Sequence, residues 1–260
     1  MLSEINIKAR NPDCIRVIQI TDTHIFESAD ADFDGCDTSA SLQRVIEHIK
    51  LQEEQADLVL LTGDLVHEPI YLAYENLKNQ LHSLTMPVFC LPGNHDAPTL
   101  MHKLLNEGNI HTKKTIKLQN WSVILLDTYL HGSHSGRLEV EELLFLENCL
   151  ENNSEENILL SMHHPPVLIG SSWMDAMTLE NSQEFFSLLD RCSELRGIIW
   201  GHIHQVFESE RKGVALYGSP SSCVQFKPKK DKYVRDDLGP AYSVLELYKD
   251  GRIEIKVQWV

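Results

Sequence analysis

The sequence predicts an α/β fold, a four-layer αββα sandwich in which two mixed β-sheets pack face to face and are flanked by helices. Short apolar runs alternate with segments of helical periodicity, as in layered α/β proteins. Two other pairs of strand-like runs are joined by tight turns, so a purely parallel sheet is not expected. With 260 residues, 42% of them hydrophobic, the chain can bury one large core, and we expect a single domain over residues 1–260.

Five short apolar runs are the predicted core strands, and polar residues follow each of them directly. Runs of this length that are bounded by turn residues are typical of β-strands. They are Ile15–Ile20, Asp57–Leu61, Pro87–Leu91, Asn157–Ser161 and Gly197–Trp200.

Helices are predicted between these runs, where apolar residues recur on one helical face. The clearest pattern lies in Ser39–Glu54, with Leu42, Val45, Ile46 and Ile49 on one side. Further helices are expected over Tyr71–Leu84, Ala97–Leu105 and Glu139–Leu150.

Hairpins and long loops account for the remaining chain. The strand pairs are Thr115–Leu118 with Trp121–Asp127, and Ala241–Tyr248 with Arg252–Trp259. The second pair flanks Asp250-Gly251, a strong signal for a tight turn. Long loops are expected over 28–38, 170–178 and 218–237, and loops of this length at strand ends often form the walls of binding sites.

Charge and composition exclude several classes of partner. The net charge of −15 argues against binding a nucleic-acid polymer, which requires Lys and Arg to neutralise phosphates. The one basic cluster, within 227–232, is interpreted as a solvated loop. The N-terminus is polar and the chain has no long apolar run, so export and membrane insertion are not expected. Six dispersed cysteines without CxxC spacing predict reduced thiols and a cytoplasmic protein.

Metal-ligand residue types gather at the ends of the five predicted strands. Residues two apart at a strand end project from the same face, so D-x-H and H-x-H can each chelate one ion. Either motif alone is weak and more often structural, but five such segments at successive strand ends are not expected by chance. They are Asp22-Thr23-His24, Gly63-Asp64, Gly93-Asn94-His95-Asp96, His163-His164-Pro165 and Gly201-His202-Ile203-His204.

These residues suit a pair of divalent cations. Oxygen ligands mixed with imidazole favour iron or manganese, with zinc, cobalt or magnesium as further choices, and no thiolate cluster supports a structural zinc site. Two ions about 3.5–4 Å apart need a bridging carboxylate, for which Asp64 is the central choice. A hydroxide that bridges such ions attacks phosphate esters, and the ions reverse the local negative charge of this acidic protein.

The motifs D-x-H, G-D, G-N-H-D, H-H-P and G-H-x-H, in this order, resemble the calcineurin-like metallophosphoesterase superfamily over nearly the whole chain. Within it, residues 19–24, 91–96, 172–175 and 220–228 resemble the bacterial class III 3′,5′-cyclic AMP phosphodiesterases. The last two stretches are the more specific, because they lie outside the metal motifs.

The resemblance implies a role for each motif residue. His95 would be an uncoordinated imidazole that donates a hydrogen bond or proton to the leaving oxygen, and Asp64, as the bridge between the metals, would be the second catalytic residue. Met162 replaces a histidine present in several members, which bears on the choice of His163 over His164. The first cation would take Asp22, His24, Asp64 and His204, the second Asp64, Asn94, His163 and His202, and substrate contacts are implied for Asn94, His95, His164 and His204.

Several residues keep two interpretations at this stage. His164 either packs beside a ligand and hydrogen-bonds there or binds metal or substrate directly. Asp96 either caps the helix that follows it or orients His95. Trp173 and Phe226 are core or lid residues, or they stack on a nucleobase. The remaining histidines, 48, 67, 82, 102, 111, 131 and 134, are expected at the surface or in support of the ligands.

The expected function is hydrolysis of 3′,5′-cyclic AMP to 5′-AMP by a hydroxide that bridges two metal ions. The alternative is a broader phosphodiesterase that accepts glycerophosphodiesters or 2′,3′-cyclic nucleotides. A non-catalytic scaffold is disfavoured, because every ligand type is present. We expect a cyclic nucleotide as the small-molecule partner, no nucleic-acid polymer or membrane, and a monomer or homodimer.

Overall fold

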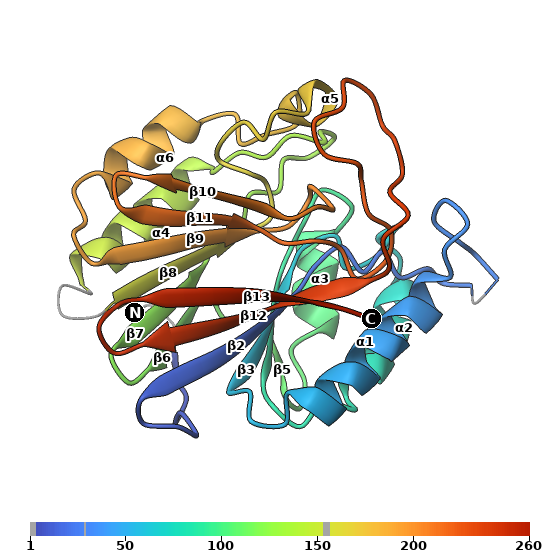
Figure 1. The fold of residues 1–260 in the computed structure, drawn as a ribbon, viewed down its shortest axis with the longest axis horizontal. Coiled ribbons are helices and arrows are strands. Elements are labelled where there is room, and N and C mark those ends of the chain that lie inside the picture. Colours follow the sequence, from blue (N-terminus) through green and yellow to red (C-terminus); the bar gives the residue numbers. More distant parts are fainter. Residues whose placement is uncertain (1–3, 29, 153–156) are drawn as a thin grey trace.

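Two β-sheets lie face to face, and helices cover the outer side of each, as the sequence predicts (Figure 1). The computed structural model describes residues 4–28, 30–152 and 157–260, so residue 29 of the predicted 28–38 loop is outside the described residues. Both sheets are mixed, because parallel core strands are extended by antiparallel neighbours.

The six-stranded sheet has the order β13-β12-β2-β3-β4-β5. Its parallel part is built on three predicted strands and a two-residue strand that was not predicted. The predicted C-terminal hairpin completes it in antiparallel orientation. The strands are β2 (Cys14–Ile20), β3 (Leu58–Thr62), β4 (Val88–Leu91), β5 (Ile110–His111), β12 (Ala241–Tyr248) and β13 (Ile253–Trp259).

The seven-stranded sheet has the order β1-β6-β7-β8-β9-β11-β10. It contains the other predicted hairpin and the last two predicted core strands, which pair in parallel. Its strands are β1 (Glu4–Asn6), β6 (Thr115–Leu118), β7 (Trp121–Leu125), β8 (Asn157–Met162), β9 (Leu195–Trp200), β10 (Phe207–Arg211) and β11 (Val214–Gly218).

Helices form the two outer layers. The six-stranded sheet is covered by α1 (Thr38–Gln52), α2 (Tyr71–Leu81) and α3 (Pro98–Leu104), and the seven-stranded sheet by α4 (Val140–Glu151) and α6 (Ser182–Leu189). A single turn, α5 (Ser172–Asp175), stands at the end of the sandwich beside the long segment between β11 and β12 (Figure 1).

The predicted helix boundaries agree with the structure to within two residues, except at the end of α2. This helix ends at Leu81 rather than at Leu84. The chain tightens there, because Ser83 N–H donates to Gln80 O and Leu84 N–H donates to Leu81 O, three residues back instead of four.

Three apolar layers fill the spaces between the four layers. One lies between the six-stranded sheet and α1–α3, one between the two sheets, and one between the seven-stranded sheet and α4 and α6. Strand residues alternate between them: Ile18 faces the helices, whereas Val17 faces the other sheet. Burial on both faces explains why the core strands are continuous apolar runs. No helix among the described residues is long and apolar enough to cross a membrane.

Leu60→Ala should lower the free energy of unfolding by about 2–5 kcal/mol, because Leu60 is fully buried between the two sheets and its loss leaves a cavity. The matched control is Leu51→Ala on α1, where the side chain is 78% exposed and the change should be within about 0.5 kcal/mol. Urea unfolding of both variants measures the difference; equal losses would contradict the assignment of the inter-sheet layer.

Candidate metal centre

The sequence-predicted metal ligands converge at one edge of the sandwich, where the carboxyl ends of strands from both sheets meet. The six-stranded sheet contributes residues after β2, β3 and β4, and the seven-stranded sheet contributes residues after β8 and β9. Asn94 is partly exposed, whereas the other six side chains are buried. The structure thus brings together all seven predicted ligands: Asp22, His24, Asp64, Asn94, His163, His202 and His204.

Asp64 lies between two clusters of ligand atoms. On one side, His204 Nε2 is 3.3 Å from Asp22 Oδ1 and 3.4 Å from His24 Nε2. Asp64 Oδ2 faces this cluster, at 3.7 Å from His24 Nε2. On the other side, Asp64 Oδ1 is 3.3 Å from His163 Nε2. Each carboxylate oxygen faces a different cluster, which is the arrangement that a bridging ligand requires.

Unpartnered polar atoms make the second cluster a candidate cation site. Asn94 Oδ1 and His202 Nε2 are buried and have no hydrogen-bond partner, and His163 Nε2 faces only the Asp64 carboxylate, at 3.3 Å. A buried polar atom left unsatisfied costs about 1–3 kcal/mol, so a ligand that bound these atoms would remove that cost. Oxygen and imidazole donors without sulfur suit a divalent transition ion. The residues therefore fit a pair of divalent cations.

The backbone holds these side chains in a rarely populated conformation. Five of the seven residues have positive φ: Asp22 at 54°, His24 at 43°, Asp64 at 50°, His202 at 67° and His204 at 46°. Positive φ is uncommon outside glycine, and such strain persists only where the surrounding fold imposes it. Because the chain turns in this way at the strand ends, polar side chains close together in the sequence point toward the same centre.

Glycines beside the ligands let the strand ends approach each other. A Cβ atom on Gly93 would lie 2.2 Å from Asp64 Oδ1, and one on Gly63 would lie 2.4 Å from His163 Nδ1. Similarly, a Cβ on Gly201 would lie 2.0 Å from Thr21 Oγ1. The glycine of each of these three motifs is thus required by close packing around the ligands.

Electrostatics pairs Asp64 with His163. Burial opposes the charge of Asp64, but the facing imidazoles of His163, His95 and His24 lower the pKa of its carboxyl group well below the usual value. Burial likewise opposes the charge of His163, yet the Asp64 carboxylate raises its pKa to about 9. Cations and protons therefore compete for His163 Nε2, and cation binding releases a proton.

Carbonyl oxygens orient two of the histidine ligands. His163 Nδ1 donates to Thr62 O and His204 Nδ1 donates to Val224 O, each at 2.8 Å. This hydrogen bond fixes the proton on Nδ1 and leaves Nε2 free to face the centre, the usual support for a metal-binding imidazole.

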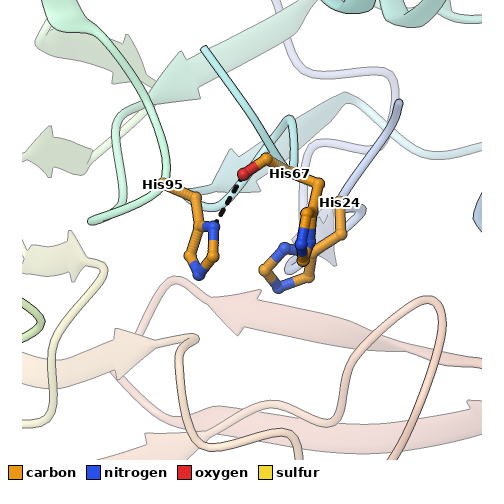
Figure 2. Close-up of side chains that lie close together, drawn as sticks. All are labelled: His24, His67 and His95. Atoms are coloured by element: carbon orange, nitrogen blue, oxygen red, sulfur yellow. Dashed lines mark hydrogen bonds between the residues drawn. The ribbon is translucent and has the colours of Figure 1, made fainter. Parts of the chain in front are cut away.

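His95 is held by His67, which was expected only to lie at the surface or to support the ligands. Its backbone N–H donates to Asp64 Oδ1 at 2.9 Å, and its Nδ1 donates to the carbonyl oxygen of His67 at 2.8 Å (Figure 2). The His67 and His24 rings lie 5.1 Å and 4.8 Å from the His95 ring. Neutral His95 thus carries its proton on Nδ1, so that Nε2 is its free nitrogen. Because His67 acts through its backbone carbonyl, the identity of residue 67 gave no signal for this contact.

Neither predicted role of Asp96 is correct. The α3 helix begins after Ala97 without a side-chain cap, and the partner that orients His95 is His67. Instead, Asp96 accepts hydrogen bonds from Leu65 N at 3.1 Å, Gly93 N at 2.9 Å and the Tyr74 hydroxyl at 3.0 Å. Asp96 therefore ties the loops after β3 and β4 together beneath the centre. Burial and the nearby Asp64 raise the pKa of Asp96 to about 7.

His164 shows the hydrogen bond that one interpretation predicts. The side chain is fully buried, and its Nδ1 lies 2.8 Å from Thr128 Oγ1. Burial and the adjacent His202 and His163 lower its pKa well below the usual value, so the ring is neutral. Direct binding of His164 to metal or substrate stays a prediction.

A cavity of about 190 Å³ opens above the ligands, and all three predicted long loops contribute to it. Its floor is formed by ligand side chains together with His95 and the exposed His134, whose Nδ1 is 3.4 Å from Asn94 Nδ2. One wall is aromatic or apolar and consists of Phe33, Trp173, Met174, Met177 and Phe226. Phe33 and His134 are cavity residues that the sequence analysis did not single out.

Residues 15–206 match the family profile described as calcineurin-like phosphoesterase. This chain belongs to the calcineurin-like phosphoesterase family. The family resemblance predicted from the five motifs is thereby confirmed.

Curated relatives of this calcineurin-like phosphoesterase match it over nearly its whole length. It is 36% identical to the 3′,5′-cyclic adenosine monophosphate phosphodiesterase CpdA of Vibrio vulnificus, with 94% of this chain and 89% of the relative covered. It is 35% identical to a 3′,5′-cyclic-nucleotide phosphodiesterase of Nostoc, with 95% and 92% covered. CpdA of Escherichia coli is 34% identical, with 94% and 89% covered.

Solved structures confirm the fold. A dimetal phosphatase from Danio rerio superposes with a TM-score of 0.70 at 14% identity, with 94% of this chain and 96% of that chain covered. The purple acid phosphatase of yellow lupin superposes with a TM-score of 0.67 at 12% identity, with 96% of this chain and 52% of that chain covered.

Asp64→Ala should abolish cation binding and activity, because the variant loses the carboxylate that faces both clusters. The contrasting variant is His95→Ala, which should keep two cations per chain and lose activity by about 10²–10⁴-fold in kcat. Elemental analysis of both proteins after dialysis, together with turnover, checks this. Loss of metal from His95→Ala would remove its assigned role beside the cations.

Tyr74→Phe should lower the free energy of unfolding by about 1–3 kcal/mol, because it leaves Asp96 short of a donor and Ala97 N without its acceptor. Tyr71→Phe, on the same helix but 56% exposed, is the matched control and should be neutral. Chemical denaturation of the two variants compares them. A neutral Tyr74→Phe would contradict the view that this hydroxyl supports the loops.

Proposed function

We propose that this protein hydrolyses 3′,5′-cyclic AMP to 5′-AMP at a pair of divalent cations. The observation that carries the proposal is the position of Asp64 between two clusters of ligand atoms, on the floor of a cavity with an aromatic wall. Full-length similarity to cyclic-nucleotide phosphodiesterases supports the choice of substrate. The chain is thus an enzyme of the phosphoric diester hydrolase class.

The two cations would be held by the residues that the structure gathers. Bound there, they would supply Lewis acidity to the phosphate and to the attacking water. We propose iron or manganese as the metal at both positions, since the ligands are carboxylate, amide and imidazole groups. Asp22, His24, Asp64 and His204 would hold the first cation, and Asp64, Asn94, His163 and His202 the second.

His95 provides the proton for the leaving group. Its Nδ1–H donates to the His67 carbonyl, so Nε2 is the ring nitrogen left to pass a proton to the leaving oxygen. His95 lines the same cavity as the ligands. Attack of a hydroxide on phosphorus forms a new P–O bond while the bond to the 3′-oxygen breaks, and a proton from Nε2 converts the departing alkoxide to the 3′-hydroxyl of 5′-AMP.

The decisive measurement is the kcat/KM profile across diesters. Manganese-loaded protein should release 5′-AMP from 3′,5′-cyclic AMP with a kcat/KM at least tenfold above those for 2′,3′-cyclic AMP and glycerophosphocholine. A flat profile would favour the broader phosphodiesterase instead. Cleavage of the other diesters without any release of AMP from 3′,5′-cyclic AMP would refute the proposal.

A further inference from the structure

The cavity divides into a polar floor and an aromatic wall. Apart from the ligands, His95 and His134, every described residue that lines it belongs to the wall. A phosphodiester bound at the floor would have these aromatic and thioether groups as the neighbours of the rest of the molecule.

The wall has exposed residues in front and buried residues behind. Trp173, Met177 and Phe33 are partly exposed, whereas Met174 is 1% exposed and Phe226 is 7% exposed. Phe226 has one face already occupied, since its ring stacks on His204 at 4.0 Å with an angle of 3° between the planes. Phe226 thus supports the wall, and Trp173 is the larger of the two partly exposed aromatic rings, Trp173 and Phe33, that are left for a ligand.

Trp173 is held in place before any ligand arrives. Its ring lies 5.4 Å from the Phe226 ring and 5.7 Å from the Tyr233 ring, the latter edge to face. The loop that carries it is joined to the 218–237 loop by Ser172 Oγ to Asp231 Oδ1 at 2.8 Å and Lys229 N to Ser171 Oγ at 2.9 Å. A pre-positioned aromatic surface loses little entropy on binding a flat ring.

We infer that the purine base of the substrate stacks on Trp173, beside Met177 and Phe33, without recognition of its hydrogen-bonding edge. This inference rests on the proposed function and adds how the base is bound. Stacking on an aromatic face tolerates different bases, because every base has a π-face. Among the described wall residues, the indole N–H of Trp173 is the one conventional side-chain donor. Adenine and guanine should therefore be accepted almost equally.

A base-free substrate isolates the stacking contact. The experiment compares kcat/KM for 3′,5′-cyclic AMP with kcat/KM for the cyclic 3′,5′-phosphate of 1-deoxyribose. In Trp173→Ala, the ratio of the two should fall by about 5-fold to 150-fold, the range measured for one stacked base. Trp173→Phe keeps an aromatic face and should restore the ratio to within about 3-fold of the wild-type value. An unchanged ratio in Trp173→Ala would overturn the inference.

Trp259→Ala is the matched control, since Trp259 is 41% exposed on β13 and lies outside the cavity lining. It should leave the ratio unchanged. A fall as large as that in Trp173→Ala would overturn the assignment of the effect to the wall.

Cyclic GMP tests the absence of edge recognition. Its kcat/KM should lie within about tenfold of that for cyclic AMP, because a site that hydrogen-bonds the base edge would discriminate by a factor of about 10⁴ or more. A preference of a hundredfold or more would overturn this part of the inference. In Trp173→Phe, which lacks the indole N–H, kcat/KM for cyclic GMP should again lie within about tenfold of that for cyclic AMP, because the indole N–H is not used to distinguish the bases.

Binding of the product separates failure of this inference from failure of the proposed function. Calorimetry with manganese-loaded protein should show tighter binding of 5′-AMP than of ribose 5-phosphate, and Trp173→Ala should remove the difference. This pattern in a protein that does not hydrolyse cyclic AMP would refute the function and support the base site. Hydrolysis with no difference between the two monophosphates would refute the base site alone.

Discussion

The carboxylate of Asp64 is the point on which the rest of the site depends. It is buried, it faces imidazoles on both sides, and it accepts the backbone N–H of His95. A carboxylate in such surroundings is tolerated only where positive charge opposes it. His163 supplies this charge by holding a proton, and two divalent cations would supply it more completely. Ligand geometry, proton balance and the placement of His95 all follow from this one group.

Holding Asp64 there requires both sheets. Asp22, His24 and Asp64 come from one sheet, whereas His163, His202 and His204 come from the other. Gln19 links them, since its Nε2 donates both to Thr62 Oγ1 and to the carbonyl oxygen of Trp200. The strained backbone at the strand ends is stable because three apolar layers fix the strands themselves. Packing far from the centre thus maintains an unfavourable local conformation where ligands are needed.

The supporting residues also connect the polar and apolar halves of the cavity. His204 donates to Val224 O through Nδ1, accepts from Phe226 N through its own carbonyl, and stacks on the Phe226 ring. His204, a candidate cation ligand, is therefore in direct contact with the aromatic wall of the cavity. A shift of the 218–237 loop would therefore move the side chain of His204, a candidate cation ligand.

The sequence by itself determined the layers and the set of candidate ligands, because both depend on local patterns. Buried strands need apolar runs, and chelating side chains need positions near each strand end, so the five core strands and the motifs that follow them could be assigned without coordinates, whereas β5 and α6 were not predicted. Short elements such as β10, an exposed edge strand with alternating charged residues, had no such pattern to reveal them. Only the tertiary structure decided which neighbours support the centre. Asp96 reaches backbone N–H groups after two different strands, and His67 orients His95 through a carbonyl oxygen, which every residue type possesses. Contacts made by the backbone or across distant segments leave no signature in residue identity, and they are set when the sheets pack.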